Sequence, residues 1–196
     1  MSVSLTPAPD LWHISSNAST LRPVLPSLVI AVLALIGSLW LSVGMGLKAC
    51  PLCLYQRTFV MGVVAVLGIG VMTGPSHRGV LNLLALPLAV AGFGVALFHV
   101  FLELTGKLEC PNGLMSIGTA PQQSLAVQAV LLIFVFVGVA RSNGCCKPTS
   151  VGAVFLGLFL AGSAIISAPP MPPVPLKAYD KPLDICRPPF RPQSQQ

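Results

Sequence analysis

Five long apolar runs, separated by short polar links, dominate the pattern along the chain. Each run is close to the roughly 20 residues that a helix needs to cross a bilayer. Backbone polar groups cannot be left unsatisfied in lipid, so we expect each run to be a helix rather than a strand. Pro87 is expected to kink the third run, where Gly92 and Gly94 favour close helix contacts. The predicted spans are residues 25–47, 54–73, 81–104, 124–140 and 151–168.

The composition supports a membrane protein and excludes several other classes. Hydrophobic residues make up 54% of the 196 residues and charged residues only 8%, whereas a soluble domain carries about a quarter charged residues. The net charge of +6 comes from basic residues scattered through the links and the tail, without the stripe that would bind a nucleic acid. We therefore predict an all-α integral membrane protein with a polar N-terminal segment (1–22), a five-helix domain (23–168) and an extended, Pro-rich C-terminal tail (169–196).

An odd number of spans sorts the six cysteines between the two faces of the membrane. Cys145 and Cys146 fall on the face that also holds the N-terminus. The basic residues close to the spans are almost evenly divided, so the positive-inside rule alone does not decide the orientation. Disulfides form in oxidising compartments, so we expect the face with four cysteines to lie outside and the N-terminus to lie in the cytoplasm. The cysteines on that outer face are Cys50, Cys53, Cys110 and Cys186.

The most informative motif is Cys50-Pro51-Leu52-Cys53, at the start of the second span. Two cysteines three residues apart lie on one face of a helix, and the unpaired N–H groups of a helix start favour the reactive thiolate. Arg57 lies one turn deeper, where a buried guanidinium is usually functional. This pattern predicts a redox site; half of a zinc site or an inert buried pair are the alternatives for the cysteines. For Arg57 the alternative is a side chain that extends to the membrane interface.

Residues 50–57, Cys-Pro-Leu-Cys-Leu-Tyr-Gln-Arg, resemble the signature of the disulfide bond formation protein B (DsbB) family. The resemblance covers roughly residues 25–115. It implies four membrane helices in the bacterial inner membrane, reoxidation of a periplasmic thioredoxin-fold dithiol oxidase (DsbA), and transfer of the electrons to ubiquinone or menaquinone. Three features depart from the family pattern: a fifth span, a second outer loop with Cys110 alone, and Gln56 where an acidic residue is common.

The resemblance also implies roles for individual residues. Cys50 and Cys53 would be the pair close to the quinone, with the Cys53 thiolate facing it, and Arg57 would belong to the quinone site. His99, in the segment His-Val-Phe-Leu, would lie near the quinone, although a lone histidine in a helix is more often a packing residue. Cys110 would form the mixed disulfide with the DsbA-like partner.

The relay that the resemblance implies needs a second cysteine pair on the same face as the CxxC motif. By span parity only Cys186 can pair there with Cys110, so the Pro-rich tail would replace the family's second loop as carrier of the second cysteine. An unpaired tail thiol, or one bonded to another protomer, is the alternative. Glu103, one turn after His99, is a candidate to hold the ring of that histidine, although an interfacial carboxylate is favoured.

A soft-metal carrier for mercury or copper is the alternative function. It would use Cys50 and Cys53 on one side of the membrane and Cys145 and Cys146 on the other, because thiolates select such ions. A path across the bilayer would need acidic, Met or Cys residues in the middle of successive spans, and those positions are aliphatic. We therefore expect no metal as a cofactor.

Overall fold

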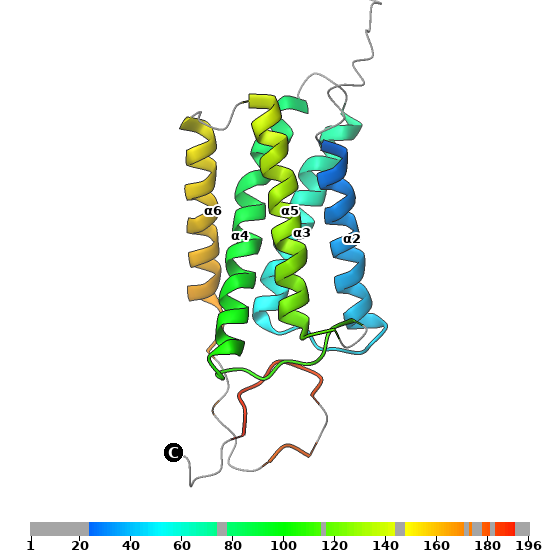
Figure 1. Ribbon diagram of the computed structural model, residues 1–196, viewed down its shortest axis with the longest axis vertical. Coiled ribbons are helices and arrows are strands. Elements are labelled where there is room, and N and C mark those ends of the chain that lie inside the picture. Colours follow the sequence, from blue (N-terminus) through cyan, green and yellow to red (C-terminus); the bar gives the residue numbers. More distant parts are fainter. Residues whose placement is uncertain are drawn as a thin grey trace, which may run out of the picture.

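The structure is a computed structural model, and it describes residues 24–73, 78–114, 117–143, 148–170, 173, 178–180 and 183–190. Within these residues, five helices are long and apolar enough to cross a membrane, and Figure 1 shows them side by side. The prediction of a multi-pass helical protein is therefore confirmed. The whole predicted N-terminal segment (1–22), together with Cys145 and Cys146, lies outside the described residues. The helices are α2 (Val24–Val43), α3 (Pro51–Met72), α4 (Arg78–Leu104), α5 (Ala120–Asn143) and α6 (Pro148–Ser167).

Two helix boundaries differ from the hydropathy pattern by four residues, and the other boundaries by three or fewer. Helix α2 ends at Val43 rather than continuing to residue 47, and the chain turns through Gly46, whose φ of 67° suits only a residue without a side chain. Helix α5 begins at Ala120, four residues before the predicted span, and its first turn contains Gln123. The side chain of Gln123 binds the preceding link: its Oε1 accepts from the Leu114 N–H at 2.8 Å, and its Nε2 donates to the carbonyl oxygens of Leu114 and Ile117.

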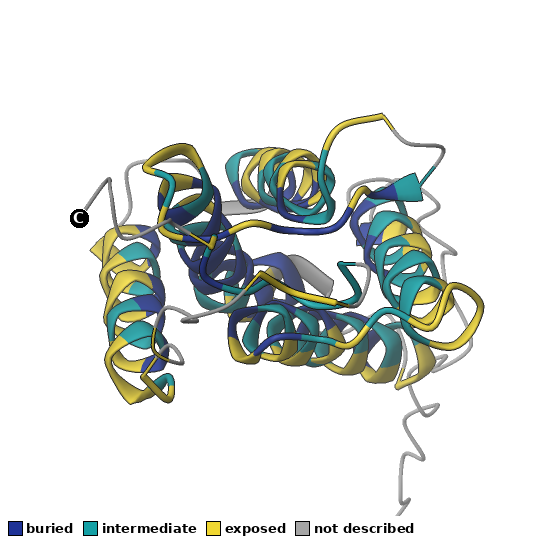
Figure 2. Ribbon diagram, turned by 90° about the horizontal axis from the view of Figure 1, so that it is seen from below, coloured by how far each residue is buried: buried dark blue, intermediate teal, exposed yellow. Residues whose placement is uncertain are grey.

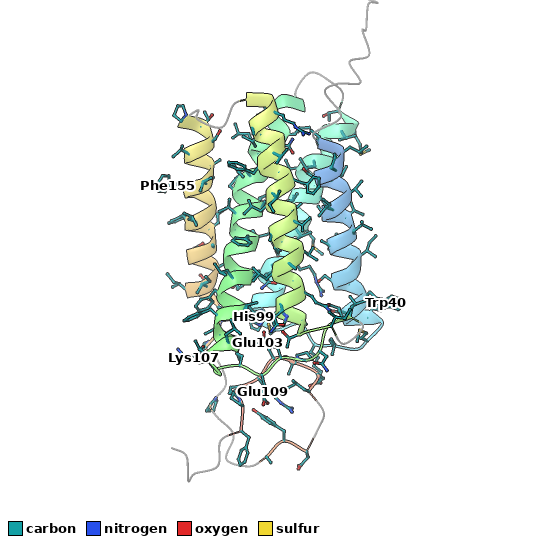
Figure 3. The ribbon with its side chains drawn as sticks, viewed as in Figure 1. Trp40, His99, Glu103, Lys107, Glu109 and Phe155 are labelled. Atoms are coloured by element: carbon teal, nitrogen blue, oxygen red, sulfur yellow. A yellow bond between two sulfur atoms is a disulfide. The ribbon has the colours of Figure 1, made fainter. Side chains whose placement is uncertain are left out.

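Helix α4 occupies the centre of the bundle. It packs against α3, α5 and α6, whereas α2 packs mainly against α3 and α5, and α6 mainly against α4. Leu67, Leu86 and Leu131 are fully buried in the main apolar core. Figure 2 shows the buried residues turned inward and the exposed ones on the outside of the bundle. The exposed residues include large apolar side chains such as Phe155, which Figure 3 shows pointing away from the bundle, as suits a face in contact with lipid.

Small residues allow α4 to approach its neighbours closely, as the sequence predicts. A Cβ on Gly94 would lie 2.9 Å from the Cβ of Ala161 in α6, and one on Gly92 would lie 2.9 Å from the amide oxygen of Gln128 in α5. Gly157 of α6 lies opposite the helix-interior proline of α4, where a Cβ would meet the Pro87 carbonyl oxygen at 2.7 Å. The docking of α6 on α4 therefore depends on the missing side chain of Gly157.

Replacing Gly157 by alanine is expected to loosen this helix pair. The added methyl would overlap backbone of α4, and overpacking of this kind costs about 1–3 kcal/mol. Gly162→Ala is the matched control in the same helix, because a Cβ there meets nothing within 4 Å. The free energy of unfolding in mixed micelles should fall for Gly157→Ala and stay level or rise for Gly162→Ala; equal values would contradict the close contact.

Candidate functional site

The CxxC motif forms the start of α3. Cys50 is the N-cap residue and Pro51 follows at the first helical position, where the missing N–H costs no hydrogen bond. The Cys53 N–H donates to Cys50 Sγ at 3.3 Å, and the two Sγ atoms lie 3.0 Å apart. Both cysteines are free thiols in the structure. The helix start thus holds a dithiol whose sulfur atoms are already close enough to form a disulfide with a small movement.

Cys110 and Cys186 are joined in a disulfide, with their Cα atoms 4.2 Å apart. Outside the CxxC motif, Cys186 is the cysteine that span parity assigns to the same face as Cys110. Backbone hydrogen bonds align the tail with the link after α4: the Glu109 N–H donates to the Arg187 carbonyl at 2.8 Å, and the Arg187 N–H to the Glu109 carbonyl at 3.0 Å. The disulfide therefore lies within a short antiparallel pairing at the end of the bundle where Figure 3 labels Glu109.

A second contact holds the tail to the link between α2 and α3. The Lys48 N–H donates to the Asp184 carbonyl at 2.8 Å, and the Lys48 ammonium lies 2.9 Å from the Asp184 carboxylate. The hydrogen bond from Lys48 lowers the pKa of the Asp184 carboxyl group. Both side chains are exposed, so the ion pair adds little stability, and the backbone bond fixes the position of the segment. These described residues of the tail are thus docked on two links.

His99 lies between the two cysteine pairs. Its ring is fully buried, and Figure 3 shows it near the C-terminal end of α4. The Nε2 atom lies 3.8 Å from Cys50 Sγ and 3.6 Å from Cys110 Sγ, whereas Nδ1 lies 4.0 Å from Cys53 Sγ. The structure therefore places this histidine against both pairs, a position that the sequence pattern did not indicate.

A chain of hydrogen bonds holds the His99 ring. The Gln56 Nε2 lies 3.4 Å from His99 Nδ1, and the Ser124 hydroxyl donates to the Gln56 Oε1. An amide nitrogen is only a donor, so Nδ1 accepts and the ring proton lies on Nε2. The sequence pattern marked Gln56 only as a departure from the family, and missed this role. Glu103 does not contact the ring: its carboxylate accepts from the Thr119 hydroxyl at 2.9 Å.

Arg57 lies beside a cavity of about 460 Å³ that is bounded by α2, α3 and α5. Its guanidinium donates to the Ser38 hydroxyl at 3.0 Å, to the Ser38 carbonyl at 2.9 Å and to the Ser42 hydroxyl at 2.7 Å. These bonds use Nε and Nη2, which leaves Nη1 without a hydrogen-bond partner among the described residues. Cys53 and Gln56 also line the cavity, and most of the other lining residues are apolar.

The cysteine and histidine cluster also has the composition of a soft-metal site. The ligand atoms of Cys50, Cys53 and His99 lie within 4.8 Å of one another, as do those of His99, Cys110 and Cys186. Cys110 and Cys186 are far from the CxxC motif in the sequence, and the folded chain brings them to the same histidine. A tetrahedral zinc site needs four ligands, and here the outer sulfurs are in a disulfide.

The Cys50 thiol, which precedes the α3 span, is the more acidic thiol of a tightly paired dithiol. Its Sγ lies 3.0 Å from the Cys53 Sγ and also lies beside His99. The hydrogen bond with Cys53 and the contact with His99 lower the pKa of Cys50, although burial opposes them. A hydrogen bond to the charged form favours that form. Cys50 is therefore expected to be a thiolate when the pair is reduced.

A titration of the reduced protein tests this expectation. The thiolate absorbance of the Cys110→Ser, Cys186→Ser variant should persist below the ordinary thiol pKa of about 8.5. The further replacement Cys53→Ala removes the main donor and should move the titration toward higher pH, because the lowered pKa depends on that hydrogen bond. Cys145→Ser and Cys146→Ser are included throughout as background. An unchanged titration after Cys53→Ala would contradict the assignment.

Comparison with known proteins agrees with the arrangement of cysteines and helices. The family model "Disulfide bond formation protein DsbB" matches residues 22–168, a range that contains all five described helices. Disulfide bond formation protein B 2 of Pseudomonas putida is 37% identical over 81 residues, which are 40% of this chain and 48% of that protein. The matched part is thus about half the length of that relative.

Two further relatives match longer stretches. Disulfide bond formation protein B of Saccharophagus degradans is 28% identical over 135 residues, 68% of this chain and 76% of that protein. Disulfide bond formation protein C of Bacillus subtilis is 31% identical over 124 residues, 56% of this chain and 86% of that protein. No solved structure matches. Since the family model covers most of the chain, including the CxxC motif and every described helix, the protein belongs to the DsbB family of membrane disulfide bond formation proteins.

Proposed function

We propose that the protein is a dithiol:quinone oxidoreductase of the bacterial inner membrane. It reoxidises a periplasmic thioredoxin-fold dithiol oxidase of the DsbA type and passes the electrons to ubiquinone or menaquinone. The observation that supports this most directly is the meeting of an outer disulfide and an inner dithiol at His99, beside a cavity lined by Cys53 and Arg57. The family supports membrane disulfide formation in general.

The chemistry consists of successive thiol–disulfide exchanges. A thiolate of the reduced partner attacks the Cys110–Cys186 disulfide, and the partner's second thiol completes its oxidation. The resulting outer dithiol exchanges with the Cys50–Cys53 disulfide. Every exchange breaks one S–S bond and forms another, so two electrons move inward without loss. In this scheme, a protein with the Cys110–Cys186 disulfide formed and with Cys50 and Cys53 as free thiols would hold the electrons on Cys50 and Cys53.

The cavity fits a quinone in size and chemistry. Small-molecule sites usually have volumes of roughly 300–1,000 Å³, with mostly apolar walls and a few polar groups that set the orientation, and this cavity of about 460 Å³ has that character. A bound quinone accepts two electrons and two protons. Arg57 would hold a quinone carbonyl oxygen through its unoccupied Nη1, and Cys53 would present its sulfur to the ring.

The orientation follows from the same chemistry. Cys50, Cys53, Cys110 and Cys186 gather at one end of the bundle, and exchange with a periplasmic partner requires that this end face the periplasm. The start of α2 lies at the opposite end in Figure 1. With the cysteines facing the periplasm, the start of α2 would face the cytoplasm, which supports the proposal of a cytoplasmic N-terminus.

Loss of either inner cysteine should stop electron transfer to quinone. We expect Cys50→Ser and Cys53→Ser each to abolish quinone reduction by a reduced DsbA-type protein, because neither single thiol can form the inner disulfide. The assay follows quinone absorbance with purified protein. The double variant Cys145→Ser, Cys146→Ser is the matched control and should retain activity. Full turnover by either inner variant would refute the proposed site.

Arg57→Met should weaken quinone binding. A hydrogen bond to a charged group contributes about 1.5–3 kcal/mol, so the KM for quinone is expected to rise roughly ten- to a hundredfold. Arg141→Met removes an equally positive side chain from the last turn of α5, away from the cavity, and should leave the KM unchanged. An unchanged KM for Arg57→Met would assign the arginine to helix packing through Ser38 and Ser42 alone.

A further inference from the structure

We propose that Cys110 is the sulfur of the outer disulfide that exchanges with Cys50, across the Nε2–H of His99, and that Cys186 is the sulfur attacked by the external dithiol. This assignment rests on the proposed function. It reverses the role that the resemblance implies for Cys110, which would there form the mixed disulfide with the partner.

Burial distinguishes the two sulfurs of the outer pair. Cys110 is 7% exposed and packs in the apolar cluster that also contains Cys50, whereas Cys186 is only partly buried at the edge of that cluster. An external thiolate must approach along the S–S axis, so it needs access to the sulfur that it attacks. Cys186 is therefore the accessible target, and Cys110 is the leaving group that stays inside.

The orientation of the inner pair leads to the same assignment. Cys50 Sγ and Cys110 Sγ both contact one nitrogen of His99, at 3.8 and 3.6 Å. Cys53 instead lies beside the other ring nitrogen and lines the cavity, which Cys50 does not. The inner pair is thus divided between two tasks: Cys50 faces the outer disulfide, and Cys53 faces the cavity.

The tautomer of His99 suits an exchange between these two sulfurs. Gln56 donates to Nδ1 and is itself held by Ser124, so the remaining ring proton points from Nε2 toward Cys50 and Cys110. An N–H donor stabilises a thiolate more than a neutral thiol. His99 would therefore stabilise the Cys110 thiolate when it is released, and later the Cys50 thiolate.

The exchange steps balance without a further reactant. The external thiolate bonds to Cys186 and releases the Cys110 thiolate, which attacks Cys50 and releases the Cys53 thiolate. The second external thiol then displaces Cys186, and the Cys186 thiolate attacks Cys110, which restores the outer disulfide and releases Cys50. The external dithiol becomes a disulfide, and its two electrons and two protons are on Cys50 and Cys53 for delivery to quinone.

A first experiment identifies the attacked sulfur. The oxidised protein, in the Cys145→Ser, Cys146→Ser background, is treated with a thioredoxin that keeps a single active-site cysteine, quenched with N-ethylmaleimide, digested and mapped by mass spectrometry. We expect thioredoxin linked to Cys186, Cys110 linked to Cys50, and the maleimide on the released Cys53. Linkage through Cys110, or equally through both cysteines, would overturn the proposal.

A second experiment compares the two possible inner exchanges without partner or quinone. In the same background, Cys53→Ser with Cys186→Ser leaves Cys50 and Cys110, whereas Cys53→Ser with Cys110→Ser leaves Cys50 and Cys186. Under diamide the first variant should form its disulfide at least about tenfold faster, the ratio that a 1.4 kcal/mol difference in barrier gives. Equal rates, or a faster second variant, would overturn the proposal. Because neither quinone nor partner takes part, a failed quinone assay would reject the proposed function and leave this result standing.

The role of Gln56 is tested by its conservative change to glutamate. A carboxylate at this position would accept from Nδ1, so ¹⁵N NMR of His99 should show the proton on Nε2 in the parent protein and a proton on Nδ1 in Gln56→Glu. The Cys50–Cys110 disulfide should then form more slowly under diamide, because the Nε2–H of His99 no longer serves as the fixed donor. Gln122→Glu, an exposed glutamine in the first turn of α5, is the matched control and should change neither measurement. The same tautomer in both proteins would overturn the assignment of the ring proton.

Discussion

The contact of one buried imidazole with two cysteine pairs is the interaction on which the rest of the site depends. His99 is fully buried on the central helix α4, and the start of α3, the link after α4 and the tail all converge on it. A buried polar ring is costly unless its hydrogen bonds are made. Here Gln56 and Ser124 satisfy one nitrogen and the sulfurs surround the other, so the same hydrogen bonds that make burial tolerable also fix the direction of the ring proton.

The convergence on His99 also explains the need for the fifth helix. Four spans would return the chain to the face from which it started, and a cysteine after the fourth span would lie on the opposite side from the CxxC motif. Helix α6 packs mainly against α4, through Gly157 and Ala161, and carries the chain back to the end that holds Cys50. The family match covers this helix together with the others, so it does not mark α6 as an addition to the fold.

The sequence predicts the helices and the cysteine pairs well, and the environment of the site poorly, for physical reasons. Apolar runs of sufficient length must form helices in lipid. Once Cys50 and Cys53 are taken as a pair, the parity of five spans leaves Cys186 as the partner for Cys110 on its face. The ends of the helices depend on local features instead, such as the positive φ of Gly46. His99 and Gln56 could not be paired from spacing, because their contact depends on how α3 and α4 are rotated against each other.

The distribution of polar groups along the bundle constrains how electrons leave the inner pair. All four described cysteines lie at one end, so no chain of thiols continues through the described helices. In the proposed function, electrons that reach Cys53 would therefore pass to an acceptor in the cavity between α2, α3 and α5. The walls of that cavity are largely apolar, and Gln56 and Arg57 line it together with Cys53. An acceptor with an apolar body and a carbonyl group at one end meets both conditions, and this favours a lipid-soluble quinone over a metal ion, which would need polar ligands along its whole path.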